Sequence, residues 1–431
     1  MNFISQHKIN LNPWQYLVIS FVILISFGTL LLQLPFVKHT NGIALIDALF
    51  TSTSAVCVTG LTTITTSGFN TAGQLAILLL IQLGAIGIMT LTSSFLLAIK
   101  GNIGLKHKML FSQIQENVGL HDAHLVLRNI LKITFFTEFI GFIVLSIGFK
   151  MEGLALPQAM YQGFFHSISA FCNAGFSTYD QSIIGMNPLI KYTISFLIII
   201  GGIGYFVIYE LLEKYKTKRR LSLHTKIVLI TSIALIVIGT LLIYFFQFSS
   251  ISFNDSFFQS VTTRTAGFNS VDLNKLPITI IFLMMLLMFI GASPGSTGGG
   301  IKTTTFFVMF YSIISVLKGK TEVSLFKRNI SIHYILKAFA TTILYIGVIV
   351  IGIILLLETN HIKMIDAIFE VVSAIGTVGL SLGITPILND FGKVILVLLM
   401  FVGRLGPASF ALATLNKQKN ILIKYPKGEI Y

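Results

Sequence analysis

The stretch SAFCNAGF at residues 169–176 has three counterparts along this chain. They are SAVCVTGL at 54–61, VTTRTAGF at 261–268 and SAIGTVGL at 373–380. Each consists of small or polar residues, then a glycine, then Leu or Phe. Self-similarity of this kind indicates repeated structural units, so the chain is interpreted as four repeats.

A short half-apolar segment precedes each of these glycines. The segments are about ten residues long, which is too short to cross a bilayer as a helix. They therefore predict half-helices that enter the membrane and stop. They are DALFTSTSA from Asp47, QGFFHSISA from Gln162, NDSFFQSVT from Asn254 and DAIFEVVSA from Asp366.

The composition predicts a membrane protein. Of the 431 residues, 54% are hydrophobic and 11% are charged, whereas soluble domains carry about 25% charged residues. About 20 apolar residues cross a bilayer as a helix, which predicts eight spans with the sixth interrupted. The predicted spans are 14–36, 74–99, 125–149, 188–212, 225–248, 276–290 with 303–317, 332–357 and 393–415.

The net charge of +14 is interpreted as a topology signal. Most Lys and Arg residues flank the termini and the even-numbered links between spans, which places both termini of this multi-pass protein in the cytoplasm. We therefore expect a plasma-membrane location and no nucleic-acid partner. The two cysteines, Cys57 and Cys172, each lie three residues before a repeat glycine. They are expected to pack behind the glycine loops rather than to form a disulfide or a redox switch.

Four glycine loops at membrane depth predict a cation filter. Backbone without helical hydrogen bonds is tolerated there only if it lines a water-filled path or is buried in protein. Rings of backbone carbonyls can replace the hydration shell of an alkali cation, and glycine allows the positive φ angles that turn successive carbonyls the same way. The negative C-terminal ends of the half-helices also favour a cation at the centre.

Together with GASPGSTGGGIKT at 291–303, the four glycine stretches resemble the superfamily of K⁺ transporters that comprises Trk, Ktr and HKT proteins, and most of all the Ktr membrane subunit. The resemblance covers essentially the whole chain. It implies an all-α membrane protein with four repeats of transmembrane helix, pore half-helix, filter loop and transmembrane helix around one central pore. The expected repeats are 1–100, 101–218, 219–320 and 321–431.

The resemblance also implies which residues hold K⁺, through their backbone carbonyls. Family members that prefer Na⁺ have serine at the first filter glycine, so Gly60 indicates K⁺. Each loop has one glycine rather than two, which implies weaker discrimination against Na⁺ and leaves a Na⁺-permeable transporter as an alternative. No cofactor is expected in this chain beyond K⁺, with Na⁺ as a second transported or coupling ion. The expected filter residues are Val58, Thr59, Gly60, Asn173, Ala174, Gly175, Thr265, Ala266, Gly267, Thr377, Val378 and Gly379.

The glycine-rich segment 291–305 interrupts an apolar run. Residues 275–318 would form a helix of about 66 Å, twice the bilayer thickness, so the helix must break near Pro294. The segment is not a nucleotide-binding loop, because Ile301 separates the last glycine from the lysine that such a loop requires. The resemblance implies that this segment is the gate. The expected gate residues are Gly295, Gly298, Gly299, Gly300, Lys302 and Arg404.

Two arginines stand in unexpected places. Arg404 lies inside the last span, and an intramembrane arginine suggests a functional site. The resemblance implies that it contacts the gate loop and forms an electrostatic barrier; an ion pair with Glu370 or Glu138 is the alternative. Arg264 lies three residues before a filter glycine and is expected to point away from the pore. Its expected partners are the carboxylates of Asp255, Glu370 and Asp47.

The basic links between spans, of which 100–124 is the longest, could contact either an acidic ring protein or anionic lipid. The resemblance favours a cytosolic nucleotide-binding ring of the RCK/KTN type, and it implies a homodimer. A membrane-embedded enzyme is the alternative from another class. It would need a polar catalytic cluster inside the spans, but the sequence has no paired His–Glu or Asp–Asp motif and no histidine cluster. The chain is therefore not expected to be an enzyme or to hold a catalytic metal.

Overall fold

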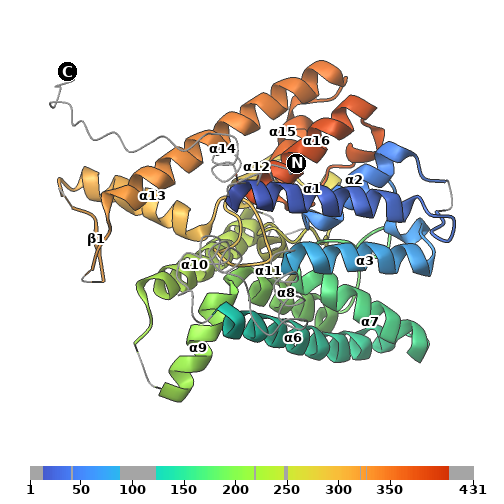
Figure 1. The fold of residues 1–431 in the computed structure, drawn as a ribbon, viewed down its shortest axis with the longest axis horizontal. Coiled ribbons are helices and arrows are strands. Elements are labelled where there is room, and N and C mark those ends of the chain that lie inside the picture. Colours follow the sequence, from blue (N-terminus) through green and yellow to red (C-terminus); the bar gives the residue numbers. More distant parts are fainter. Residues whose placement is uncertain are drawn as a thin grey trace, which may run out of the picture.

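The computed structural model describes residues 13–39, 42–87, 123–217, 220–246, 251–320, 322–326 and 328–406. These residues are mostly helical (Figure 1). The only strands among them are β1 (Ser324–Leu325) and β2 (Arg328–Asn329), which pair antiparallel.

Each of the four predicted repeats contains a long helix, a short helix, an extended glycine loop and a third helix. The long helices are α1 (Pro13–Leu32), α6 (Ala123–Met151), α10 (Leu223–Phe246) and α14 (Ile332–Thr359). The short helices, at the four positions predicted for half-helices, are α2 (Leu45–Val56), α7 (Leu156–Phe171), α11 (Phe253–Thr262) and α15 (Met364–Gly376). The third helices are α3 (Thr71–Ile86), α8 (Pro188–Ile203), α12 (Ile278–Phe289) and α16 (Asp390–Leu405).

Five further elements connect or extend these units. Two α-helices continue the third helices of the second and third units, and single 3₁₀ turns precede the third helix of the first, third and fourth units. The α-helices are α9 (Tyr205–Thr217) and α13 (Thr303–Leu317), and the 3₁₀ turns are η1 (Thr66–Gly68), η2 (Leu273–Lys275) and η3 (Thr385–Ile387).

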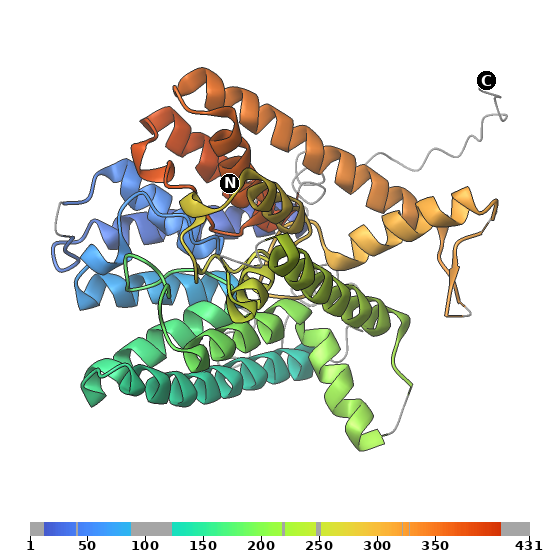
Figure 2. The ribbon, with the colours of Figure 1, turned by 180° about the vertical axis from the view of Figure 1, so that it is seen from behind.

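The short helices and third helices close a ring. The third helix of each unit packs against the short helix of the next, in the pairs α3–α7, α8–α11, α12–α15 and α16–α2. The last pair joins the fourth unit to the first. Figures 1 and 2 show these helices packed together in one body.

The third helices of three units begin with the same cap. The side chains of Asn70, Asn187 and Asn389 each accept a hydrogen bond from the N–H three residues later, at 2.8–3.1 Å. An Asn cap of this kind satisfies a backbone donor that the helix leaves free. The third unit instead starts α12 directly after Pro277, whose fixed φ suits a helix start.

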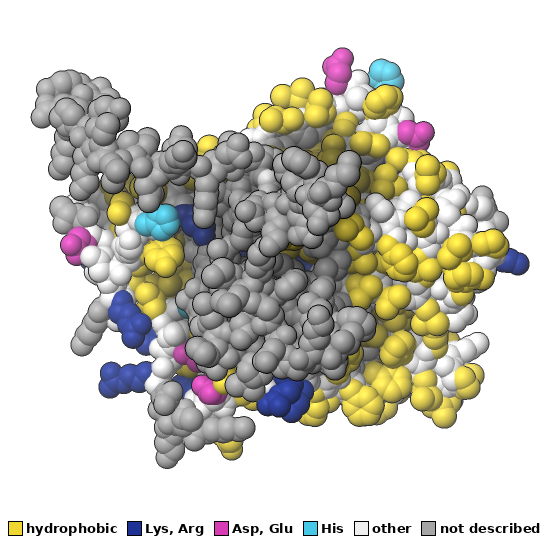
Figure 3. Space-filling model, in the orientation of Figure 1, with side chains coloured by type: hydrophobic (Ala, Val, Ile, Leu, Met, Phe, Trp, Pro, Cys, Tyr) yellow, Lys and Arg dark blue, Asp and Glu magenta, His cyan; other side chains and the backbone are white. Residues whose placement is uncertain are grey.

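The outer surface of the long helices is apolar. Large exposed side chains include Ile23 and Leu30 of α1 and Phe135, Phe136 and Phe139 of α6. In Figure 3 such side chains cover much of the visible face, while most visible Lys and Arg lie toward the left and lower edge. A wide exposed apolar surface is expected where lipid is the solvent, so the chain is a membrane protein.

Four of the helices, α1, α6, α10 and α14, are long and apolar enough to cross a membrane alone, and α8 with α9 makes a fifth if the bent pair is one span. α12 and α13 are shorter, as expected for an interrupted span. The far ends of the predicted spans 74–99 and 393–415 lie outside the described residues, as do the link 100–122, most of the N-terminal segment and the tail from residue 407.

The span predicted at 188–212 is not one straight helix. α8 ends at Ile203, and α9 leaves it at an angle of 94°. The turn occurs at Gly204, which has a φ of 97°. The chain bends here because the next residue contacts the glycine-rich loop: the N–H of Tyr205 donates to the carbonyl of Gly295 at 3.1 Å. A Cβ at Gly204 would lie 2.5 Å from the Pro294 carbonyl oxygen.

Candidate functional site

The four glycine loops share one backbone pattern. The glycines have φ angles between 72° and 96°, and the residue two positions earlier has a φ between 50° and 67°. The residue between them does not adopt a positive φ. The glycines are Gly60, Gly175, Gly267 and Gly379, and the earlier left-handed residues are Val58, Asn173, Thr265 and Thr377.

The N–H groups of these loops point back toward the short helices. In three loops the residue before the glycine donates to a serine carbonyl at 2.8 Å, and in the third loop it donates to a threonine carbonyl at 3.0 Å. The N–H and C=O of a trans peptide point in opposite directions, so the carbonyls of the left-handed residues point away from the short helices. The donor–acceptor pairs are Thr59–Ser54, Ala174–Ser169, Ala266–Thr262 and Val378–Ser373.

Hydroxyl groups at the ends of the short helices hold the loops further. The N–H of Gly60 donates to Ser54 Oγ at 3.0 Å, and the N–H of Gly379 donates to Ser373 Oγ at 3.1 Å. By the same peptide geometry, the carbonyls of Thr59 and Val378 then also point away from their helices. One carbonyl of every loop, and a second in the first and fourth loops, therefore face away from the short helices, toward the space between the loops.

The four glycines are neighbours in a closed cycle. A Cβ at Gly60 would lie 2.5 Å from the carbonyl oxygen of Ala174, one at Gly175 would lie 2.6 Å from that of Ala266, and one at Gly267 would lie 2.5 Å from that of Val378. The cycle closes because a Cβ at Gly379 would overlap the carbonyl oxygen of Thr59. Each glycine thus leaves room for an oxygen of the next loop, and the residues that carry these oxygens are fully buried: Thr59, Ala174, Ala266 and Val378.

The glycine-rich loop between α12 and α13 packs directly against these strands. The Gly299 N–H donates to Thr377 Oγ1 at 3.0 Å. The Thr297 hydroxyl donates to the Phe171 carbonyl at 3.2 Å and lies 3.3 Å from the amide of Asn173. The loop therefore closes one side of the space between the glycine loops, at the ends of the short helices.

Two cations hold this loop through its backbone. Arg404 donates to the carbonyl of Thr297 and, at 2.8 Å, to the carbonyl of Gly84. Lys302 Nζ donates to the carbonyl of Gly298 at 2.8 Å. The contact between Arg404 and the loop is therefore present, as expected.

The alternative ion pairs of Arg404 are not formed. Glu138 accepts hydrogen bonds from Gln82 at 3.0 and 3.2 Å. Glu370 accepts a hydrogen bond from the Thr385 hydroxyl. Both carboxylates are therefore engaged elsewhere.

The carboxylate partner predicted for Arg264 is also wrong. The Arg264 guanidinium points away from the glycine loops and donates to Ser232 Oγ on α10 at 3.1 Å. Asp255 pairs with Lys191, and Asp47 pairs with Lys393. The reason is geometric. Arg264 follows the C-terminal end of α11, whereas Asp255 and Asp47 lie in the first turns of α11 and α2.

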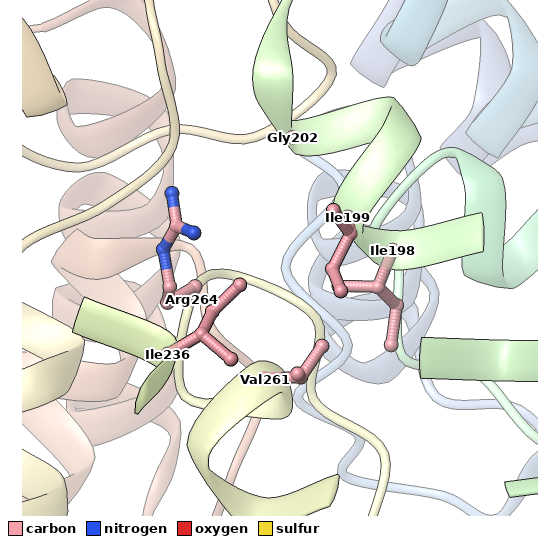
Figure 4. Close-up of a pocket in the computed structure, with 6 residues that line it drawn as sticks. All are labelled: Ile198, Ile199, Gly202, Ile236, Val261 and Arg264. Atoms are coloured by element: carbon pink, nitrogen blue, oxygen red, sulfur yellow. The ribbon is translucent and has the colours of Figure 1, made fainter. Parts of the chain in front are cut away.

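A small cavity adjoins Arg264 (Figure 4). Its volume is about 10 Å³, which is room for about one water molecule. The Arg264 Nε has no hydrogen-bond partner within the described part of the chain, so this cavity adjoins an unsatisfied donor. The lining residues are Ile198, Ile199, Gly202, Ile236, Val261 and Arg264.

Both cysteines are buried and free. Cys172 Sγ lies 3.3 Å from Gln82 Oε1, behind the second glycine loop. Burial of both side chains agrees with their predicted packing role.

A second glycine pattern marks the third helices and was not recognised in the sequence. Glycines at 84, 201 and 403 would each overlap, if they had a Cβ, a backbone carbonyl at the end of the short helix in the same unit. Three residues later, Gly87, Gly204 and Gly406 end these helices with φ angles of 80° to 97°. The third unit has Gly291 followed by Pro294 at the same spacing. The repeated G-x-x-G signal thus marks the end of three third helices, whereas α12 already ends at Phe289, before Gly291.

Comparison with known proteins agrees with this architecture. The family model of TrkH, described as a cation transport protein, matches residues 6–422. The Ktr system potassium uptake protein B of Bacillus subtilis is 36% identical over 98% of this chain and 97% of its own length. The potassium/sodium uptake protein NtpJ of Enterococcus hirae is 35% identical over 97% of each chain.

A solved structure shares the fold. The crystal structure of the potassium transporter TrkH from Vibrio parahaemolyticus matches with a TM-score of 0.73 at 20% identity, over 95% of this chain and 86% of that chain. The family match, which spans nearly all of this sequence, confirms the family resemblance inferred from the glycine loops. This chain belongs to the TrkH family of cation transport proteins.

Proposed function

We propose that this protein is the pore-forming subunit of a K⁺ uptake system in the plasma membrane. The observation that carries the proposal is the closed cycle of Gly60, Gly175, Gly267 and Gly379, in which each glycine leaves space for a carbonyl oxygen of the next loop. Carbonyl rings of this kind substitute for the hydration shell of K⁺. The three-residue segments that end at these glycines would form the selectivity filter and hold K⁺ through backbone oxygens.

The gate in this proposal is segment 291–305, and Gly295, Gly298, Gly299, Gly300, Lys302 and Arg404 are its functional residues. The loop lies against the filter, and its carbonyls at Thr297 and Gly298 are held by Arg404 and Lys302. Two cations beside the ion path would also repel K⁺. Ion passage would then require the loop and both side chains to withdraw.

The proposed assembly is a homodimer with both termini in the cytoplasm, regulated by a nucleotide-binding ring of the RCK/KTN type. Support comes from a relative that is named as protein B of a Ktr system, which indicates more than one component. The exposed basic residues Lys318, Lys320 and Arg328, near the β1–β2 hairpin, offer a surface for an acidic partner or for anionic lipid.

A Na⁺-permeable transporter is the second candidate. One relative is named as a potassium/sodium uptake protein and is 35% identical. Each loop has a single glycine, so few ordered carbonyl layers are available to discriminate between the two ions. Transport of K⁺ with substantial Na⁺ permeability would fit this candidate.

The decisive experiment is Rb⁺ uptake into liposomes that contain only this chain, with and without competing Na⁺ or K⁺. K⁺ selectivity predicts that external K⁺ suppresses Rb⁺ uptake at much lower concentration than Na⁺ does. Equal suppression by the two ions would favour the Na⁺-permeable candidate. No uptake above empty liposomes by folded protein would count against transport by this chain alone.

A further inference from the structure

We propose that three filter side chains, those of Asn173, Thr265 and Thr377, form a latch that holds the glycine-rich loop closed, while the first filter strand takes no part in it. This inference rests on the proposed function, because it concerns how the proposed gate is held. It assigns a positioning role to side chains of residues whose backbone carbonyls were proposed to bind the ion.

Consecutive residues of the loop meet consecutive filter strands. Thr297 Oγ1 lies 3.3 Å from the amide of Asn173, in either orientation of that amide. A Cβ at Gly298 would overlap the Thr265 hydroxyl. The Gly299 N–H donates to the Thr377 hydroxyl at 3.0 Å.

The three latch residues occupy equivalent positions. Each is the left-handed residue two positions before a filter glycine, and each is fully buried. The Asn173 amide also lies 3.4 Å from the Thr265 hydroxyl, which connects two of the three.

The first strand provides the internal comparison. Its equivalent residue is Val58, with a φ of 55°, and valine has no hydrogen-bonding group to offer the loop. On this side the loop is held instead by Arg404, which bridges the carbonyls of Thr297 and Gly84. The loop is thus fastened by side chains of strands two, three and four and by the last helix beside strand one.

The latch also explains why two loop positions are glycine. Gly298 faces the Thr265 hydroxyl, and a Cβ at Gly299 would overlap the Thr377 hydroxyl. Larger residues there would separate the loop from the filter. The contact between loop and filter therefore depends on small residues on one side and polar side chains on the other.

The test is Thr377→Val in liposomes that contain the chain without any partner. Val58 shows that valine is accommodated at this backbone position, and the filter carbonyls stay in place. Because the variant removes one hydrogen bond that only the closed loop makes, we expect basal Rb⁺ uptake to rise about three- to tenfold. The ratio of K⁺ to Na⁺ competition should not change. Thr297→Val is the second variant, should the first fail to fold, because it removes the loop hydroxyl that contacts the Phe171 carbonyl and the Asn173 amide.

The matched control is Thr240→Val. It removes an equally buried hydroxyl that bonds only to the Ile236 carbonyl within α10. Uptake by this variant should equal that of the unmodified protein. An increase equal to that of Thr377→Val would show a general loosening of the fold and would overturn the latch.

A second readout does not depend on transport. Ser296→Cys places a thiol where the closed loop buries the native hydroxyl, in a chain whose native thiols are also buried. Adding Thr377→Val should speed its reaction with a water-soluble thiol reagent several-fold. Unchanged reactivity and unchanged uptake would overturn the latch. Absence of Rb⁺ uptake together with faster labelling would instead contradict the proposed transport and leave the latch supported.

Discussion

The two ends of the glycine-loop ring are held together in different ways. At the outer end, where the short helices begin, charged and polar side chains connect neighbouring units. Lys191 bonds to Asp255 at 2.6 Å, and Lys393 bonds to Asp47 at 2.8 Å. At the inner end, where the short helices finish, three third helices end at glycines and the loop between α12 and α13 packs against the glycine loops. One end is therefore built to keep its shape, and the other end contains the segments that could move.

The outer bridges are unevenly distributed. Tyr161 OH donates to Gln74 at 2.6 Å and joins units one and two, while the two lysine–aspartate pairs join units two to three and four to one. The remaining contact, between α12 and α15, has no such bridge within the described residues. α12 is ITIIFLMMLLMF, with Thr279 as its only hydrogen-bonding side chain. The one boundary without a polar bridge thus belongs to the helix that leads into the proposed gate.

The largest effect is expected from Gly267→Ala, which disturbs the ring of glycine loops itself. The φ of 77° is unfavourable for alanine, and its Cβ would lie 2.5 Å from the Val378 carbonyl oxygen. Rb⁺ uptake should fall more than about tenfold, because a displaced carbonyl costs a filter site several kcal/mol. Uptake at the unmodified level, measured on folded protein in liposomes, would argue against a filter at this ring. Gly153→Ala is the control, since it also replaces a glycine with positive φ but has open space around it.

Deleting residues 296–300 removes the middle of the inner loop and should have the next largest effect. The deletion eliminates the contacts of the loop with Asn173 and Thr377 and with Arg404. Basal K⁺ flux should rise severalfold because the obstruction below the filter is lost. A lower flux from correctly assembled protein would contradict the proposed gate.

Gly60→Ser sharpens the comparison by altering the selectivity of the same ring. A serine side chain there would approach the Ala174 carbonyl oxygen, which lies 2.5 Å from the Cβ position. Displacing that oxygen should favour the smaller ion, so Na⁺ passage should rise a few-fold relative to K⁺. The ratio is measured by competition of the two ions with Rb⁺, and an unchanged ratio would remove Gly60 from the filter.

The smallest effect is expected from Lys393→Met, which removes one outer bridge. The Lys393 and Asp47 side chains are only 12% and 15% exposed, and leaving one partner of a buried pair unpaired costs about 3 kcal/mol or somewhat less at this partial exposure. The melting temperature in detergent should fall by a few degrees. Lys275→Met is the control, because its pair with Asp272 is exposed and contributes little. Equal shifts in the two variants would refute a special role for the buried bridge.

Much of the local structure could be predicted from residues that are close in sequence. The half-apolar segment before each glycine predicted a short helix, and helices are present at all four places. The length of the 275–318 run and Pro294 predicted the break between α12 and α13. The bend at Gly204 was missed, although the repeated G-x-x-G spacing in the third helices carried the signal.

Contacts between distant residues could not be predicted in the same way. Arg264 was assigned a carboxylate partner by charge alone, but the position of α10 decides that it bonds to Ser232. Lys393 and Asp47 are 346 residues apart, and only closure of the ring brings them together. Composition indicates that buried charges need partners; it does not indicate which partners lie within reach.

The sequence by itself determined the family, the membrane character, the four glycine positions and the interruption near Pro294, because composition, chain length and backbone stereochemistry act locally. Only the tertiary structure decided the order in which the glycine loops meet, the strands that the 297–299 segment contacts and the carbonyls that Arg404 holds. These features depend on the packing of segments that are 78 to 320 residues apart, and side-chain chemistry alone leaves several such arrangements open.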